Sequence, residues 1–345
     1  MTTNFRSDNE TPVASAIMDA ILEANQGTAW AYAEDDWSNR LDQAFSDLFR
    51  TEAVVLPVST GTVANSIALA TVTPPWGSVV CHRGAHILND ECGAPEFFGD
   101  GLRLVPVDGE HGKLKPGAVE EAVWANQGHG VHSYKASALS LTQATEGGTV
   151  YSIEEVSALC DTAHKLGMKT HMDGARFGNA IASLGCHPAE VTCEAGIDML
   201  SFGASKNGCM AAEALVIFNR PQWRETAERL RKRSGHLLSK MRYVSAQLLA
   251  YIENDRWLEM ASHANRQATK FAGAVTNHDQ AGLEYPVDAN EVFVKWSNEG
   301  FEHLRAQGIQ FQMWPGRDDL ARFVFGHSTS DEDTQVLIGS FNERK

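Results

Sequence analysis

The chain has 345 residues, of which 43% are hydrophobic and 21% are charged, so it can bury a sizeable core. Its 44 acidic and 29 basic residues give a formal charge of -15, and a surface of this sign repels nucleic acid and anionic lipid. No apolar run approaches the roughly 20 residues that span a bilayer, and the first ten residues are polar. We therefore expect a folded, cytoplasmic protein that binds neither nucleic acid nor membranes.

Over the middle of the chain, short apolar runs rich in β-branched residues alternate with amphipathic helical stretches, which predicts βαβ units and a mainly parallel sheet. The clearest helix covers 153–166. Ser152 and Glu155 can form a capping box before it, and Gly167 suits a left-handed C-cap after it. The predicted strands of this region are 53–58, 78–82, 138–142, 169–173, 197–202 and 215–218.

The last third of the sequence has a different pattern. Residues 220–277 are mainly helical, and a strand–helix–strand–strand–helix order follows over 291–296, 299–307, 309–314, 321–326 and the residues from 331 onward. This order predicts a second, smaller α+β domain. We expect an α/β protein with a large domain over residues 1–250 and a small one over 251–345.

The carboxyl ends of parallel strands are the usual place for a ligand, so residues that directly follow a strand are candidates for a site. The segment 59–65 follows the first strand and begins a helix. Thr60, Gly61 and Thr62 there offer free N–H groups and the positive end of a helix dipole to an anion, most often a phosphate. The alternative is an ordinary threonine N-cap. No GxGxxG or GxxxxGK[ST] motif points to a dinucleotide or Walker-type nucleotide.

Asp173 ends the predicted strand 169–173. A carboxylate at a buried strand end needs a cationic partner or strong donors, because an unpaired buried charge is costly. The structural alternative is that Asp173 pairs with Arg176 and braces the turn.

Lys206 follows the strand 197–202 and lies between glycines. A lysine at the mouth of an α/β crevice can lose solvation and act as a Schiff-base amine, although most lysines are simply solvated. Asn207 stands where the GxSxG nucleophile motif needs glycine, which disfavours a serine hydrolase.

His86 follows the strand 78–82 and points toward the same crevice. With His82, Cys81 and Cys92 it could suggest a metal site, but the spacing matches no metal-binding motif, so no metal is expected. The alternative is a satisfied structural histidine.

Pyridoxal 5'-phosphate requires the four groups found at these strand ends: a helix start that can bind phosphate, a carboxylate, a lysine and a histidine. The helix start would hold the phosphate, a carboxylate would keep the pyridine nitrogen protonated, a lysine would bond the aldehyde, and a flat side chain would stack on the ring. The sequence therefore predicts this cofactor.

These segments resemble the threonine aldolase family, a branch of the fold type I pyridoxal-phosphate enzymes, and most closely its low-specificity L-threonine and phenylserine aldolases. The matching motifs are TGT-x-A-N at 60–65, DECGAPEFF at 90–98, TQATEGGTVY at 142–151, HMDGARF at 171–177 and SFGASKNG at 201–208. The resemblance implies a large sheet domain, a small C-terminal domain, and a homodimer or homotetramer with shared active sites. It also implies that a basic residue of the cluster 231–233 reaches the neighbouring subunit's site.

Carried over residue by residue, the resemblance assigns the cofactor contacts. Lys206 would bond the cofactor, Asp173 would hold the pyridine nitrogen, and His86 would stack on the ring and could transfer a proton. The phosphate would be held by Thr60, Gly61 and Thr62.

The resemblance also assigns the substrate contacts. Arg176 and Arg322, with Ser7, would bind the substrate carboxylate, and Arg176 would lie beside the cofactor as well; bidentate guanidinium groups suit this task. His132 matches a second histidine of the family near the substrate hydroxyl and is the other candidate base.

The reaction implied by the resemblance is cleavage of a β-hydroxy-α-amino acid at the Cα–Cβ bond to glycine and an aldehyde. A first alternative is another pyridoxal-phosphate activity on the same scaffold, such as β-elimination or racemisation. A second is a binding protein that has kept the fold without catalysis, or a protein that uses a different phosphorylated ligand.

Overall fold

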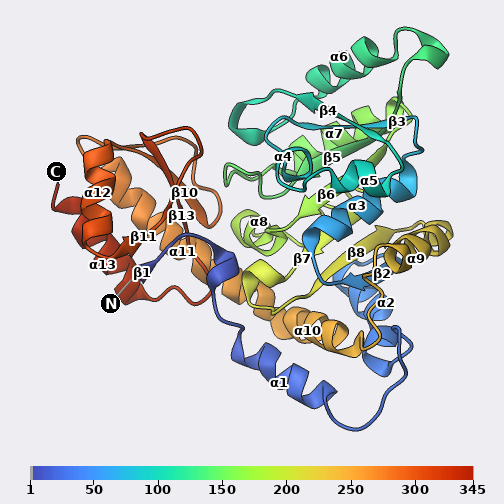
Figure 1. Cartoon of the computed structure of the whole chain (residues 1–345), viewed down its shortest axis with the longest axis horizontal. Coiled ribbons are helices and arrows are strands. Elements are labelled where there is room, and N and C mark those ends of the chain that lie inside the picture. Colours follow the sequence, from blue (N-terminus) through green and yellow to red (C-terminus); the bar gives the residue numbers. More distant parts are fainter. Residues whose placement is uncertain (1–2, 345) are drawn as a thin grey trace.

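The computed structural model describes residues 3–344, and its largest unit is a seven-stranded sheet (Figure 1). The strand order is β2-β8-β7-β6-β5-β3-β4, in which β8 runs antiparallel to both neighbours and every other pair is parallel. The mainly parallel α/β fold expected from the sequence is thus confirmed. The strands are β2 (Ala53–Val58), β3 (Gly77–His82), β4 (Arg103–Val107), β5 (Lys135–Thr142), β6 (Lys169–Gly174), β7 (Met199–Gly203) and β8 (Glu213–Phe218).

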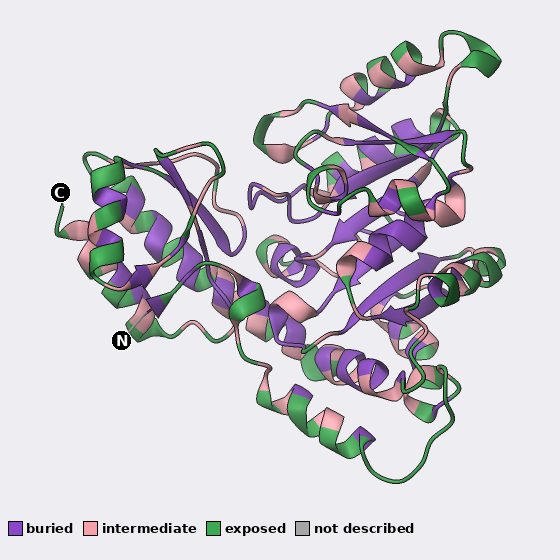
Figure 2. Cartoon of the chain, in the orientation of Figure 1, coloured by how far each residue is buried: buried purple, intermediate pink, exposed green. Residues whose placement is uncertain are grey.

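Helices cover both faces of this sheet because its strands are apolar on both sides. Along β2, Val54 and Leu56 pack into a core with α3 and α9, whereas Val55 packs into the core on the opposite face. Figure 2 shows the buried strands between helices whose outer surfaces are exposed. One face carries α3 (Gly61–Val72) and α9 (Arg224–Arg233), and the other carries α2 (Asp36–Phe49), α6 (Pro116–Gln127), α7 (Ile153–Lys165) and α10 (Arg242–Ile252). The remaining helices before α9 are α1 (Ser15–Ala24), α4 (His86–Asn89), α5 (Ala94–Phe98) and α8 (Phe177–Leu184).

The crossover helix α7 forms as its sequence predicts. The capping box between Ser152 and Glu155 is present, and Gly167 after the helix has a φ of +78°. The strand β4 was not predicted, because this run of five residues at the sheet edge contains Pro106 and shows no clear alternation. Within residues 3–344, no helix combines the length and the apolarity needed to cross a membrane.

The C-terminal part forms a smaller lobe around a second core, which contains Phe271, Phe323, Phe325 and Phe341. The strand expected over 309–314 is in fact two short ones, because β11 pairs with the N-terminal β1 and β12 pairs with β13. The four-stranded sheet has the order β12-β13-β10-β9. The strands of this lobe are β1 (Thr3–Asn4), β9 (Gly282–Leu283), β10 (Glu291–Lys295), β11 (Ile309–Gln310), β12 (Gln312–Met313) and β13 (Leu320–Val324). Its helices are α11 (Arg256–Thr276), α12 (Asn298–Ala306) and α13 (Asp331–Asn342).

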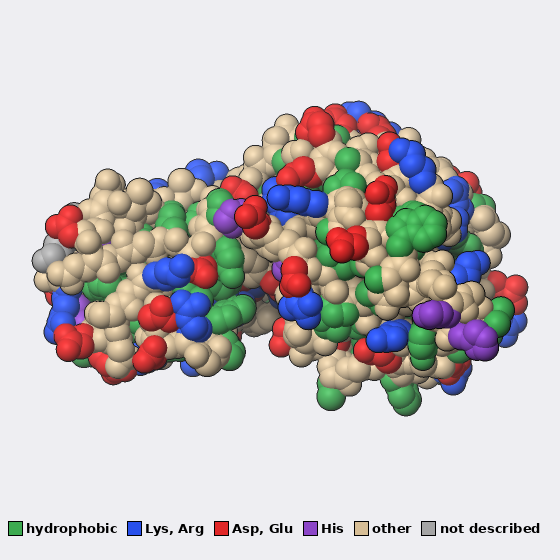
Figure 3. All heavy atoms as spheres, turned by 90° about the horizontal axis from the view of Figure 1, so that it is seen from above, with side chains coloured by type: hydrophobic (Ala, Val, Ile, Leu, Met, Phe, Trp, Pro, Cys, Tyr) green, Lys and Arg blue, Asp and Glu red, His purple; other side chains and the backbone are tan. Residues whose placement is uncertain are grey.

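The long helix α11 connects the two lobes. Trp257 near its start belongs to the core of the large sheet, and Phe271 near its end belongs to the smaller core, which also contains Phe5 from the N-terminus. In the space-filling view of Figure 3 the surface is pinched between the lobes, and acidic and basic side chains are interspersed over this face. The domain boundary at 250/251 stays a prediction.

Candidate active site

A continuous cleft lies at the carboxyl ends of the parallel strands. It consists of an inner cavity of about 370 Å³ over the sheet and an outer cavity of about 510 Å³ that reaches the smaller lobe. The two cavities share the wall residues Asn9, His86, Glu146, Arg176 and Lys206. A larger cavity, about 570 Å³, lies elsewhere between α1, α2 and α10, and none of the predicted site residues lines it.

The start of α3 borders the inner cavity and has free donors. Thr60 is the N-cap, and its Oγ1 accepts a hydrogen bond from Val63 N at 3.4 Å. In the described part of the chain, no group accepts a hydrogen bond from the N–H of Gly61 or Thr62. A Cβ added to Gly61 would meet nothing within 4 Å, so the space beside this backbone is open. The helix start can therefore hold an anion.

Asp173 is buried at the end of β6, on the floor of the inner cavity. Its Oδ1 accepts from Ala175 N at 3.0 Å, and its Oδ2 accepts from Asn65 Nδ2 at 2.9 Å. The alternative in which Asp173 pairs with Arg176 is wrong, because the guanidinium of Arg176 binds other carboxylates.

The imidazole ring of His86 is held by the carboxylate of Glu91. Its Nδ1 lies 2.9 Å from Glu91 Oε1, and the same oxygen accepts from Asn65 Nδ2 at 2.8 Å. The hydrogen bond to Glu91 raises the pKa of His86, which favours the imidazolium. Asn65 therefore links two acidic residues, one beside the histidine and one at the strand end, Asp173.

Lys206 lies in the 3-10 turn η4 (Ser205–Asn207), which is fixed on both sides. The Glu213 carboxylate accepts from Ala204 N at 3.2 Å and from Ser205 N at 3.3 Å. On the other side, Asn207 Nδ2 donates to Tyr251 Oη at 2.7 Å. Burial raises the pKa of Glu213 to about 7. These contacts hold the lysine in the wall between the two cavities.

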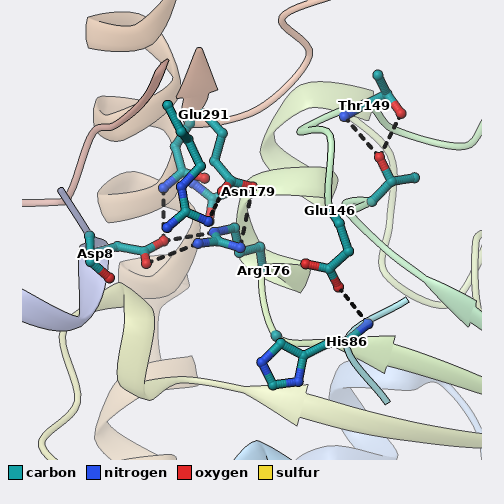
Figure 4. A network of polar contacts seen from close by, with 12 residues as sticks. Asp8, His86, Glu146, Thr149, Arg176, Asn179 and Glu291 are labelled. Carbon is teal, nitrogen blue, oxygen red and sulfur yellow. Dashed lines mark hydrogen bonds and ion pairs between the residues drawn. The ribbon is translucent and has the colours of Figure 1, made fainter. Parts of the chain in front are cut away.

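Arg176 joins the two lobes through an ion-pair network (Figure 4). Its Nε and Nη2 donate to Asp8 at 2.8 and 3.1 Å, and its Nη1 lies 3.2 Å from Glu291 Oε2. Burial alone would lower the pKa of Arg176, but Asp8 and Glu291 raise it above its usual value, so the guanidinium is charged. Each of its three nitrogens already has a partner. Its role as a substrate ligand stays a prediction.

Arg322 lies next to this network, on β13. Its Nη1 lies 3.4 Å from Glu291 Oε1 and its Nη2 donates to Gln312 Oε1 at 2.7 Å, whereas its Nε has no partner among the described groups. Arg322 and Ser7 both line the outer cavity. Ser7 Oγ accepts from Asn9 N at 3.2 Å, which caps the short turn η1 (Asp8–Glu10).

The structure does not bring His132 into the cleft of its own chain. This residue ends the exposed turn η3 (Gly130–His132), directly before β5, and therefore lies at the amino end of a strand whose carboxyl end reaches the site. His132 borders neither the inner nor the outer cavity.

The basic cluster 231–233 is divided among three environments. Arg231 is buried, and burial lowers its pKa to about 10. Lys232 lies 4.7 Å from the ring centre of Tyr32, and Arg233 pairs with Asp100 at 3.3 Å on the surface. A contact from this cluster to a neighbouring subunit stays a prediction.

Several polar residues of the site were not singled out by the sequence analysis. They hold or adjoin predicted residues, and they are Asp8, Asn65, Glu91, Glu146, Glu213 and Glu291. Three of them stand inside the motifs that carry the family resemblance: Asn65, Glu91 and Glu146. Their position in those motifs was the available signal.

Comparison with known proteins agrees with this fold. The family described as beta-eliminating lyase matches residues 4–299. The low specificity L-threonine aldolases of Pseudomonas aeruginosa and of a second Pseudomonas strain are 41% and 40% identical to this chain; the alignments cover 97% and 96% of it, and 96% and 95% of those proteins. The solved structure of Leishmania major threonine aldolase has the same fold, with a TM-score of 0.92 and 23% identity over 99% of this chain and 98% of that one.

The chain therefore belongs to the beta-eliminating lyase family and, within it, to the threonine aldolases. The resemblance noted in its motifs is confirmed.

Proposed function

We propose that this protein is a pyridoxal-phosphate-dependent aldolase that cleaves β-hydroxy-α-amino acids to glycine and an aldehyde. The observation that carries the proposal is one cleft in which a buried carboxylate, a lysine and a free helix start surround the inner cavity, while an arginine lies in the outer one. The Pseudomonas relatives, which are low specificity L-threonine aldolases, support the substrate class.

The residues of the inner cavity fit the cofactor. The free N–H groups of Gly61 and Thr62 suit the phosphate, Asp173 suits a protonated pyridine nitrogen, and Lys206 suits the aldehyde. His86 lines the same cavity and would stack on the ring. When bound, the cofactor would withdraw electrons from the substrate Cα and so stabilise the charge that develops there.

Residues of the outer cavity would orient the substrate. Arg322 would bind the substrate carboxylate from the wall of the outer cavity, which Ser7 lines as well. Gln312 and Glu291 hold the two terminal nitrogens of Arg322 and so fix the guanidinium in place. A carboxylate held in this way sets which bond at Cα is presented for cleavage, so Arg322 acts on turnover as well as on binding.

The side chains that line the outer cavity would contact the part of the substrate that is released as the aldehyde. Tyr285 and Trp314 line it and pack against Phe293 with ring centres 5.2 Å apart in each case. An aromatic wall and a volume of about 510 Å³ accommodate a phenyl group as well as a methyl group. We propose L-threonine, L-allo-threonine and L-phenylserine types as substrates. The cytoplasmic location and the homodimer or homotetramer with shared sites stay predictions.

The test is product analysis with the cofactor-loaded protein and a panel of β-hydroxy amino acids that includes both diastereomers. We expect glycine and the matching aldehyde in equal amounts. Lys206→Ala should lose nearly all of this turnover and the visible absorption of the lysine-bound cofactor, because no other lysine among residues 3–344 lines the cleft. Release of a keto acid or of the mirror-image amino acid instead would indicate the β-eliminating or racemising alternative.

A further inference from the structure

Cleavage of the Cα–Cβ bond requires a group that takes the proton of the β-hydroxyl, and this inference rests on the function proposed above. Such a group must face the cleft, must have a free acceptor atom, and must be unprotonated in part of the molecules near neutral pH. Most acidic groups of the site fail one of the first two conditions. The Asp173 carboxylate and the Glu213 carboxylate are each occupied by two donors, and the Glu91 side chain has no exposed surface.

His86 is also a poor acceptor. Its Nδ1 is held by Glu91, and this hydrogen bond raises its pKa, so the imidazole is more often protonated than a free one. A protonated imidazole can donate a hydrogen bond or stack on a ring, but it cannot take a proton.

Glu146 satisfies the geometric conditions. It lines both cavities, at the boundary between the inner part over the sheet and the outer part beside the smaller lobe. One oxygen, Oε1, accepts from the backbone N–H of His86 at 3.2 Å, and no group in the described part of the chain donates to the other oxygen. Figure 4 shows the carboxylate between His86 and Arg176, with its second oxygen turned away from the histidine.

The backbone that carries Glu146 is rigid. Thr145 N donates to Thr149 O at 2.8 Å and Gly148 N donates to Thr145 O at 2.9 Å, which closes a tight turn around the glutamate. The Thr145 and Thr149 hydroxyl oxygens lie 2.7 Å apart, and Figure 4 shows this contact beside Glu146. A carboxylate on such a turn keeps its position, as proton transfer requires.

The charges around Glu146 suit a proton acceptor. Burial, and then the neighbouring carboxylate of Asp173, raise its pKa to about 7, against the lowering effect of Lys206 and Arg176. Near neutral pH the group therefore exists in both forms and can take a proton and lose it again. The titratable and charged groups that face it are His86 on α4, Asp173 on β6, Arg176 before α8, Lys206 on η4 and Glu291 on β10.

We propose that Glu146 is the catalytic base that accepts the proton of the substrate's β-hydroxyl. As its carboxylate takes the proton, the O–H electron pair becomes the second bond of the aldehyde C=O and the Cα–Cβ bond breaks. The electron pair of that bond stays with the fragment that becomes glycine, which gains one proton at Cα. One proton is removed and one is added, so the step needs no co-reactant.

The variant that tests this is Glu146→Gln, because glutamine keeps an oxygen that can accept from His86 N but cannot take a proton. Two reactions of the cofactor-loaded enzyme are compared: cleavage of the β-hydroxy amino acid, and exchange of the α-hydrogen of glycine in D₂O followed by NMR. Glycine has no β-hydroxyl, so its exchange does not need the proposed base. We expect kcat/KM for cleavage to fall by about 100-fold or more, while glycine exchange and the visible cofactor spectrum stay close to those of the wild type.

The pH profile is the second readout. In the wild type, kcat/KM for cleavage should decline below about pH 7, as Glu146 becomes protonated, and this limb should be absent from the residual activity of Glu146→Gln. Glu146→Asp keeps the carboxylate and should retain both the acid limb and more cleavage than the glutamine variant. Glu120→Gln, on the exposed side of α6, is the matched control and should match the wild type.

Three results would overturn the proposal: cleavage by Glu146→Gln within about twofold of the wild type, an unchanged acid limb in that variant, or an equal loss of cleavage and glycine exchange. If Glu146→Gln does not bind the cofactor, a Glu146→Asp variant with no acid limb would overturn it as well. Failure of the proposed function is a separate result, because the wild type itself would then neither cleave the substrates nor exchange glycine.

Discussion

Replacing Arg176 by glutamine should weaken the whole fold. Its guanidinium ties Asp8 of the N-terminal segment and Glu291 of the smaller lobe to the turn after β6, and all three side chains are almost completely buried. Glutamine at this position would leave two buried carboxylates without their principal cation.

The size of the effect follows from these contacts. Removing one partner of a buried ion pair costs about 3–5 kcal/mol. In the variant, Asp8 would still accept a hydrogen bond from Asn290 at 3.1 Å, and Glu291 would still form its ion pair with Arg322 at 3.4 Å. We therefore expect a loss of stability at the lower end of that range, about 3 kcal/mol. With roughly 2.1 cal/mol/K of unfolding entropy per residue, a chain of this length should lose about 4 °C in Tm.

The assay is thermal unfolding of the cofactor-loaded wild type and variant at several pH values. Burial alone would raise the pKa of Asp8, but Arg176 and Lys206 bring it below the ordinary value of 3.8. A carboxyl with a lowered pKa contributes stability that is present above its unfolded pKa and is lost as pH falls through the folded one. The difference in Tm should therefore be complete at neutral pH and should shrink below about pH 4.

Two further variants make the result specific. Arg317→Gln removes an exposed pair with Asp319 and should leave Tm unchanged. The double variant Asp8→Asn/Arg176→Gln lacks one of the two buried carboxylates that Arg176→Gln leaves without their principal cation. It should therefore regain part of the stability. A Tm of Arg176→Gln within 1 °C of the wild type, or no recovery in the double variant, would refute the account of this network.

Two other substitutions test the inner cavity and the lysine turn. Asp173→Asn should retain the cofactor through its phosphate but lose turnover by about 100-fold or more, because an amide does not keep the ring nitrogen protonated. Steady-state kinetics would measure the turnover, and the visible spectrum would show that the cofactor is bound. Near wild-type turnover would contradict this prediction. Gly203→Ala should cost about 1–3 kcal/mol in urea unfolding, since a Cβ there would lie 2.6 Å from Ala175 O and 2.7 Å from Gly174 O. Gly273→Ala, in α11 with nothing within 4 Å, is its control and should gain up to about 1 kcal/mol, so equal effects of the two changes would exclude the steric explanation.

The predictions that succeeded rest on short-range patterns. The helix α7 is set by a capping box and by an apolar stripe that lie within fifteen residues of each other, and the strands of the large sheet other than β4 are recognisable from their own runs of apolar residues. The topology rule for parallel sheets then places Asp173 and Lys206 at the same edge of the sheet, because both stand at the carboxyl ends of strands that run in the same direction.

The partners of those residues could not be predicted in the same way. Arg176 bonds Asp8, which is 168 positions away, although a nearer carboxylate, Asp173, stands three residues before it. The same carboxylate instead accepts from Asn65, 108 positions away, and Asn65 in turn reaches Glu91. Which donor meets which acceptor depends on how α3, β6 and the N-terminal segment cross in space.

The sequence alone determined the class of this protein, its main strands and helices, and the residue types gathered at the strand ends. The tertiary structure decided that His132 lies at the opposite end of β5 from the cleft, that Arg176 is occupied by two carboxylates, and that Glu146 faces both cavities. The physical reason is the distance along the chain over which each kind of interaction acts. Caps and apolar periodicity act over one or two turns of chain, whereas burial, ion pairing and the pKa of a buried carboxyl are set by groups that only folding brings together.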